Sequence, residues 1–349
     1  MKKMFRMCVF TMLCISVLGC TSREEATVDF SDPIKFNDHG SVKLPSTTTY
    51  AQKRGFGDMN GDGIDDMYEI NDEVLFGTDY KVNVYKGYYD VNGIINFSEK
   101  VVTYDVPVDF KWFSSLTKID VADVNGDGYY DIVFSQYTEG FSKDEMQLGY
   151  AINDKNNSFY KHKSKIKVGD DKTIQYLILM FIDGYSYSDD SLSDYLKMDW
   201  GDMNGDGRDD LVLMWRTYGS GNLDIEIFYS SDDNDGDNIG FSNYNSFSYD
   251  NFLYSRNIRN VDIENYTGSK AQDILVRSSF GEYLIISVLE NTTNGFIPHR
   301  DFHCVTMDLD FFGFEKFDSF DIDNDGYADM IHLGEIDDNK VCVYNTVRI

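Results

Sequence analysis

Short runs rich in Val, Ile, Tyr and Phe, in which apolar and polar residues alternate, recur along the chain from about residue 28 onward. Alternation with a period of two is typical of half-buried β-strands, and no stretch shows the 3.6-residue period of an amphipathic helix. Segments rich in Asp, Asn and Gly separate these runs. The pattern therefore predicts an all-β chain built of short antiparallel strands.

One of the polar segments recurs with fixed internal spacing: Asp-x-[Asn/Asp]-x-Asp-Gly-x-x-Asp, with apolar or small residues on both sides. It occurs intact four times, as loop 1 (Asp58–Asp66), loop 2 (Asp123–Asp131), loop 3 (Asp202–Asp210) and loop 5 (Asp321–Asp329). A decayed copy starts at Asp262, lacks the central Asp-Gly and reads as three residues longer. The first aspartates of the five copies are 65, 79, 60 and 59 residues apart, which indicates a structural repeat.

An aromatic residue at the end of a polar turn forms a second landmark in each repeat. Phe97, Phe159, Phe241 and Phe296 follow the first aspartate of their repeats by 39, 36, 39 and 34 residues. Each repeat therefore reads as a strand, the Asp loop, a second strand, a longer loop, a third strand, a tight turn and a fourth strand. Four antiparallel strands in about 60 residues are typical of one blade of a β-propeller.

The two ends of the chain complement each other. After Asp321 only 28 residues follow, too few for the turn aromatic and the fourth strand of that repeat. The stretch from Val28 to Leu44 supplies one strand ahead of loop 1. We expect this N-terminal strand to pair with the C-terminal repeat and close a ring of five blades. An open sheet of hairpins and a larger ring remain alternatives.

The spacing within the loops suits a calcium ion, a hard cation that takes 6–8 oxygen ligands. Side-chain oxygens at loop positions 1, 3, 5 and 9 and the carbonyl of position 7 can surround one ion, and glycine at position 6 permits the sharp turn. The predicted ligands, for about four ions, are Asp58, Asn60, Asp62, Ile64 and Asp66 in loop 1, Asp123, Asn125, Asp127, Tyr129 and Asp131 in loop 2, Asp202, Asn204, Asp206, Arg208 and Asp210 in loop 3, and Asp321, Asp323, Asp325, Tyr327 and Asp329 in loop 5.

Other metal sites fit the loops less well. Glu69 supplies the twelfth-position glutamate of an EF-hand in loop 1, but Phe134, Leu213 and His332 stand at that position in the other loops. Magnesium prefers a tight octahedron with retained waters, and zinc or iron would call for the His or Cys that the loops lack. We expect the ions to brace the turn between two strands rather than to contact an external ligand.

At these residues the sequence resembles the FG-GAP/VCBS repeat family, the β-propeller repeats also found in integrin α-subunits. The segments that carry the resemblance are Phe56–Met67, Val121–Val133, Trp200–Leu213 and Phe320–Ile331. The resemblance implies a calcium-binding propeller over residues 28–349. It leaves the ligand open, since the family serves adhesion, carbohydrate binding and secretion scaffolds alike.

The first nineteen residues read as an export signal. Lys2, Lys3 and Arg6 precede an apolar run that is too short to span a membrane, and Val17-Leu18-Gly19-Cys20 follows. This ending resembles the bacterial lipoprotein box, in which the cysteine is lipidated. We therefore expect a signal peptide (1–19), a lipidated tether (20–27) that begins at Cys20, and an outer-membrane lipoprotein whose membrane face is undetermined. Ordinary signal cleavage nearby is the alternative.

Charge and composition narrow the classes of molecule that the chain is expected to bind. The chain carries a formal net charge of −29, and loss of the three basic residues of the signal makes it more negative. Such a surface repels nucleic acid and anionic membranes, so we expect membrane contact only through the lipid anchor. Aromatic residues make up 15% of the chain, which argues against disorder. Cys304 and Cys342 are left outside the signal and anchor, either as one disulfide or as two buried thiols.

For function, the sequence favours a binding module for carbohydrate or protein over an enzyme. No nucleophile elbow, P-loop or dinucleotide-binding glycine pattern is present in the sequence. The ring face opposite the loops is the expected ligand face, with Trp112, Tyr185, Tyr187, Trp215 and Tyr218 as candidates for stacking on sugars or peptide side chains. A polysaccharide-active enzyme, either a glycoside hydrolase or a lyase, and a scaffold subunit of an envelope complex remain the alternatives.

Overall fold

The computed structural model describes residues 35–43, 45, 51–72, 79–107, 118–136, 145–155, 158–167, 196–216, 222–232, 239–250, 257–280, 283–301, 316–336 and 340–347. The predicted signal peptide, the tether with Cys20, the ligand-face candidates Trp112, Tyr185, Tyr187 and Tyr218, and Cys304 lie outside the described residues.

The described strands form five four-stranded antiparallel sheets. The first sheet contains β2 (Ala51–Gly57), β3 (Asp66–Asp72), β4 (Asp79–Tyr89) and β5 (Ile95–Pro107). The second contains β6 (Lys118–Ala122), β7 (Asp131–Gln136), β8 (Glu145–Asn153) and β9 (Phe159–Lys167). The third contains β10 (Leu196–Gly201), β11 (Asp210–Arg216), β12 (Leu223–Asp232) and β13 (Ile239–Tyr249). The fourth contains β14 (Asn257–Glu264), β15 (Asp273–Phe280), β16 (Tyr283–Thr292) and β17 (Gly295–Asp301). The fifth contains β18 (Lys316–Phe320), β19 (Asp329–Ile336), β20 (Lys340–Val347) and β1 (Lys35–Lys43).

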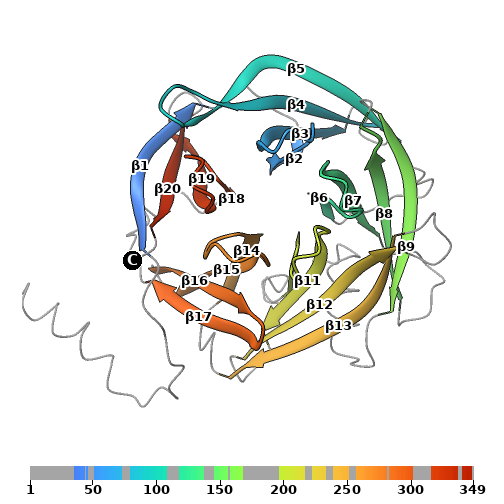
Figure 1. Ribbon diagram of the computed structural model, residues 1–349, viewed down its shortest axis with the longest axis vertical. Helices are drawn as coiled ribbons and strands as arrows, with labels where there is room; N and C mark the ends of the chain where they lie inside the picture. Colours follow the sequence, from blue (N-terminus) through green and yellow to red (C-terminus); the bar gives the residue numbers. More distant parts are fainter. Residues whose placement is uncertain are drawn as a thin grey trace, which may run out of the picture.

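The sheets are arranged around a central axis (Figure 1). The first strand of each sheet lies innermost, and β2, β6, β10, β14 and β18 are neighbours in that order, with β18 next to β2 again. The fourth strands β5, β9, β13 and β17, together with β1, lie at the periphery (Figure 1). The prediction of an all-β chain with a β-propeller arrangement is therefore confirmed.

The first and last strands of the described chain share one sheet. β1 pairs antiparallel with β20, from Lys35 opposite Val347 to Lys43 opposite Lys340, with an irregularity between Asp38 and Gly40. The spacing at the two ends of the chain predicted this partnership. Because β20 is covered by β1, the fifth sheet reaches the same four strands as the others and β20 is not left as an open edge.

Buried apolar side chains fill the space between each pair of neighbouring sheets. Among the described residues they form five clusters, and each cluster draws on two sheets. Representative pairs that share a cluster are Val84 with Phe134, Leu148 with Leu213, Val212 with Val276, Tyr266 with Met330, and Phe56 with Phe320. Complete burial of one such side chain contributes roughly 1.5–3 kcal/mol. Packing between the faces of the sheets therefore holds the ring together.

The turn aromatics take part in this packing. Each of them stands at or near the start of the fourth strand of its sheet, as the repeat pattern predicted. Phe97 lies 6.2 Å from Phe320 of the fifth sheet, and Phe296 lies 5.2 Å from Phe247 of the third sheet, measured between ring centroids. These residues recur because they fasten each sheet to its neighbour. No membrane-spanning helix is found in the described parts of the chain.

Candidate metal-binding loops

Loops 1, 2, 3 and 5 hold the same place in their sheets, between the innermost strand and the second strand. They join β2 to β3, β6 to β7, β10 to β11, and β18 to β19. In the fourth sheet the equivalent connection joins β14 to β15 and runs from Asn265 to Asp273. We call this segment loop 4. It has the same nine-residue length as the others.

This register corrects the alignment of the decayed copy. The sequence suggested that it starts at Asp262 and contains three additional residues, but Asp262 lies within β14. Asn265 occupies position 1, because its Oδ1 accepts the Gly268 N–H at 2.7 Å, as Asp58 Oδ1 accepts the Gly61 N–H at 2.6 Å. Asp273 then occupies position 9. The acidic residue before the loop misled the alignment.

The aspartate at position 1 caps the turn. In loop 1 the Asp58 carboxylate accepts the N–H groups of Gly61, Asp62 and Gly63 at 2.6, 3.1 and 2.7 Å. Asp202 in loop 3 accepts the corresponding three N–H groups at 2.6–3.0 Å. The glycine at position 6 has a positive φ in each intact loop, from 81° to 92°, which a residue with a Cβ rarely adopts. Position 1 therefore fixes the shape of the loop.

The aspartate at position 9 is fully or almost fully buried in every loop, and its oxygens mostly accept backbone N–H groups. Asp210 accepts the N–H of Met203 at 3.0 Å and that of Ser230 on β12 at 2.8 Å. Burial raises the pKa of Asp210 to about 8 and that of Asp66 to about 6, and the other acids of each loop add to the increase. Burial therefore disfavours the charged form of this aspartate despite its backbone N–H donors, and an approaching cation would favour it.

Positions 3 and 5 lie beside each other. Asn204 Nδ2 donates to Asp206 Oδ2 at 3.0 Å in loop 3, and Asn125 Nδ2 donates to Asp127 Oδ2 at 3.3 Å in loop 2. In loop 1 the position-3 amide of Asn60 donates instead to Asp66 at position 9, at 2.7 Å. Each amide nitrogen directs a hydrogen-bond donor at the carboxylate, in the place where a metal ion would supply positive charge. Rotation of the amide group by 180° would direct its oxygen toward the same place.

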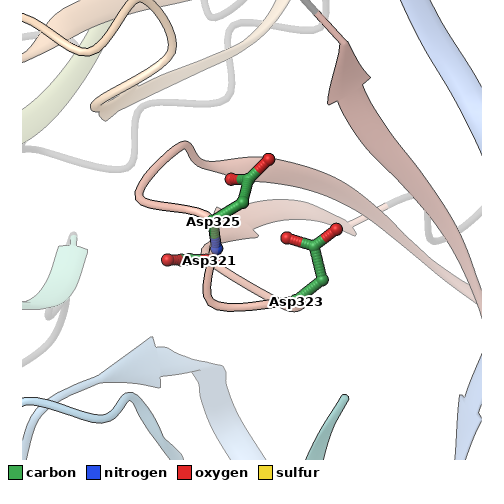
Figure 2. A group of neighbouring side chains, drawn as sticks. All are labelled: Asp321, Asp323 and Asp325. Carbon is green, nitrogen blue, oxygen red and sulfur yellow. Dashed lines mark hydrogen bonds between the residues drawn. The ribbon is translucent and has the colours of Figure 1, made fainter. Parts of the chain in front are cut away.

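Two observations show that the residues present fit a hard cation. In loop 5, carboxylate oxygens of Asp321, Asp323 and Asp325 lie within 4.8 Å of one another, and the three side chains project from the turn between β18 and β19 (Figure 2). In loop 2, Asp131 is completely buried, and among the described residues its Oδ2 has no hydrogen-bond partner. A buried carboxylate oxygen without a partner carries a substantial desolvation cost that a cation can offset.

Loop 4 forms the same turn without acidic side chains at positions 1, 3 and 5. Asp273 Oδ2 accepts the N–H groups of Tyr266 and Thr267 and the Thr267 hydroxyl at 3.1, 2.8 and 2.8 Å. Its Oδ1 accepts the Asn291 N–H at 2.8 Å. Thr267 stands at position 3 and Ser269 at position 5, where the intact loops have Asn or Asp. Loop 4 therefore holds its position-9 aspartate with hydrogen bonds alone.

The loops also touch one another, which the spacing within a single loop did not indicate. The N–H of position 8 donates to the carbonyl of position 1 in the preceding loop, from Tyr130 to Asp58, Asp209 to Asp123, Gln272 to Asp202 and Ala328 to Asn265, at 2.8–3.0 Å. Side chains at position 7 cover the preceding position 4: the Tyr129 ring lies against Gly61, and Arg208 lies against Gly126. The repeated glycine at position 4 was the available signal, since a Cβ there would collide with these neighbours.

Two other residues singled out in the sequence, Trp215 and Glu69, are buried within the sheets. Trp215 was predicted to lie on the ligand face, and that prediction is wrong. The side chain is 7% exposed and packs in the core between the second and third sheets. Glu69 is completely buried, bonded to Arg54 at 2.9 Å and to the Tyr85 hydroxyl at 3.1 Å, which removes it from loop 1.

No protein-family model matches the chain, and no curated protein matches it. The β-propeller domain of Nup133 from Vanderwaltozyma polyspora is similar in structure, with 11% sequence identity and a TM-score of 0.32. That similarity covers 80% of this chain and 71% of the Nup133 domain.

Proposed function

We propose that this chain is a calcium-binding β-propeller of five blades that is anchored at the bacterial envelope and acts as a ligand-binding or adhesive module. The five sheets correspond to the blades, and the cycle of innermost strands and the core cluster between the fifth and first sheets support a closed ring. The signal segment and Cys20 support export and lipidation. The binding role for carbohydrate or protein rests on the resemblance to FG-GAP/VCBS repeats.

The observation that carries the calcium proposal is the shared geometry of the four intact loops. Each holds a capping aspartate at position 1, a buried aspartate at position 9 and polar oxygens at positions 3 and 5. The donor set consists of oxygen atoms only, which suits calcium better than zinc or copper. Calcium in these loops would neutralise carboxylates that otherwise repel one another.

Calcium binding can be counted by isothermal titration calorimetry on the chelated protein. We expect about four ions per chain and a higher melting temperature in calcium than in EDTA, because each independent site adds about 2.7 kcal/mol at 100 times its Kd. Asp325→Asn should reduce the stoichiometry from about four to about three. Asp105→Asn, which removes an exposed charge on β5, is the matched control and should leave the stoichiometry unchanged. Identical melting curves in EDTA and calcium would refute the proposal.

A further inference from the structure

One peptide group connects each loop to the loop before it. The carbonyl of position 7 and the N–H of position 8 belong to the same planar peptide. The carbonyl is a proposed metal ligand in its own loop, and the N–H donates to the carbonyl of position 1 in the preceding loop. For loops 2 and 1 this is the Tyr129–Tyr130 peptide and Asp58, at 3.0 Å.

The junction of loops 2 and 3 has a second bond. The Asp209 N–H donates to the Asp123 carbonyl at 2.9 Å, and Asp209 Oδ2 accepts the Asp123 N–H at 2.7 Å. Both hydrogen-bonding groups of the Asp123 backbone are therefore held by one residue of loop 3. Asp123 and Asp209 are both buried, so the bonds lie away from competing water.

We propose that cation binding is positively coupled along loops 1, 2 and 3. This inference rests on the proposed calcium function. Coordination of the position-7 carbonyl polarises its peptide, which makes the position-8 N–H a stronger donor to the preceding loop. The same bond orders position 1 of that preceding loop, whose carboxylate is a proposed ligand. Ordering a site before its ligand arrives removes part of the cost of binding.

Loop 4 interrupts the coupling. The Gln272 N–H donates to the Asp202 carbonyl and the Ala328 N–H donates to the Asn265 carbonyl, both at 2.8–2.9 Å, so the bridging bonds continue through the fourth sheet. However, the position-7 carbonyl of loop 4 belongs to a turn that hydrogen bonds already hold. At the junction of loops 5 and 1, the Asp321 carbonyl accepts the Tyr89 hydroxyl at 2.9 Å. Loop 5 is therefore expected to bind independently of loop 3.

Two double variants with the same number of intact loops test the coupling. The first, Asp62→Asn with Asp325→Asn, keeps the adjacent loops 2 and 3. The second, Asp62→Asn with Asp127→Asn, keeps loops 3 and 5, which loop 4 separates. The replaced side chains stand at position 5, are at least partly exposed and retain their shape as asparagine, so we expect the variants to fold. Triple variants with one intact loop give the reference affinities.

Calcium titration by calorimetry is the measurement. We expect loops 2 and 3 together to bind at least about fivefold more tightly than their single-loop affinities predict, a typical allosteric coupling, whereas loops 3 and 5 bind independently. Adding Asp209→Ala to the first variant should reduce the excess. Independent binding in both double variants, or an equal excess in both, would overturn the coupling but leave the calcium proposal intact. Absence of calcium binding in the unmodified chain would overturn both.

Discussion

Loops 3 and 4 lie on adjacent sheets, span nine residues each and end in a buried aspartate, but different groups surround that aspartate in the two loops. Asp210 accepts two backbone N–H groups beside the acids of its own loop. Asp273 accepts three N–H groups and a threonine hydroxyl. The position-9 aspartate therefore belongs to the turn itself, whereas the acids at positions 1 and 5, with Asn or Asp at position 3, distinguish the loops that we propose to bind a cation.

The largest expected effect comes from removing the position-9 aspartate that both loops share. Asp273→Ala and Asp210→Ala should each lower the free energy of unfolding in EDTA by about 3 kcal/mol, because each buried donor left unsatisfied costs roughly 1–3 kcal/mol. Urea titration measures both. In calcium, only Asp210→Ala should show an additional loss. A change below about 1 kcal/mol for Asp273→Ala would mean that this aspartate does not hold the turn.

The second test uses pH. The folded pKa of Asp210 is about 8, above its ordinary value of 3.8, because of burial. The folded state therefore binds a proton more tightly than the unfolded state, so this contribution to stability is complete below pH 4 and is lost as the pH rises toward 8. In EDTA the urea midpoint should fall between pH 5 and pH 8. Asp210→Asn should flatten this slope and saturating calcium should abolish it; an unchanged slope in Asp210→Asn contradicts the assignment.

The third test compares glycines at position 4. Gly205 and Gly268 have φ values of 75° and 79°, so alanine costs each of them about 1–2 kcal/mol in backbone strain. A Cβ on Gly205 would meet the Lys270 side chain at 3.2 Å, whereas one on Gly268 would meet the Tyr327 ring at 2.8 Å. Gly268→Ala should therefore be the more destabilising by thermal unfolding. Gly207→Ala, with a positive φ and no neighbour within 4 Å, is the control for strain alone.

The smallest effect concerns loop 1, which has a cation of its own. Lys86 Nζ lies 2.5 Å from Asp62 Oδ2 and is exposed. Exposed ion pairs contribute at most about 1 kcal/mol, so Lys86→Met should tighten calcium binding at loop 1 by up to about fivefold. Calorimetry on a variant with loop 1 as the only intact loop measures this. Unchanged or weaker affinity would show that the lysine does not compete with the metal.

Much of the fold was predictable because each repeat carries two landmarks that are visible in the sequence. The loops marked every sheet, the turn aromatics marked the first four, and the complementary ends predicted the pairing of β1 with β20. The alignment of the decayed copy was wrong because Asp262 imitates position 1 while Asn265 performs its role. Hydrogen bonding, rather than charge, decides which residue caps the turn, and a single sequence does not display that choice.

The candidate site was predictable within a loop but not between loops. Spacing placed the side chains at positions 1, 3, 5 and 9, which are local in sequence. The contacts of position 8 depend on how adjacent sheets are set against each other, and the residue varies from Asp209 to Gln272 and Ala328 because its backbone makes the bond. Trp215 was misplaced for a similar reason, since an aromatic residue suits a core and a ligand face equally.

The pairing of β1 with β20 has a kinetic consequence. Residues 35 and 347 meet in one sheet, so the hydrogen bonds between β1 and β20 join positions separated by almost the whole chain. The entropic cost of such closure grows only slowly with length, but contacts this distant in sequence form late. Until then β20 presents an unpaired edge to other chains. Self-association during refolding should therefore concentrate at this seam, and a free peptide of the β1 sequence should suppress it.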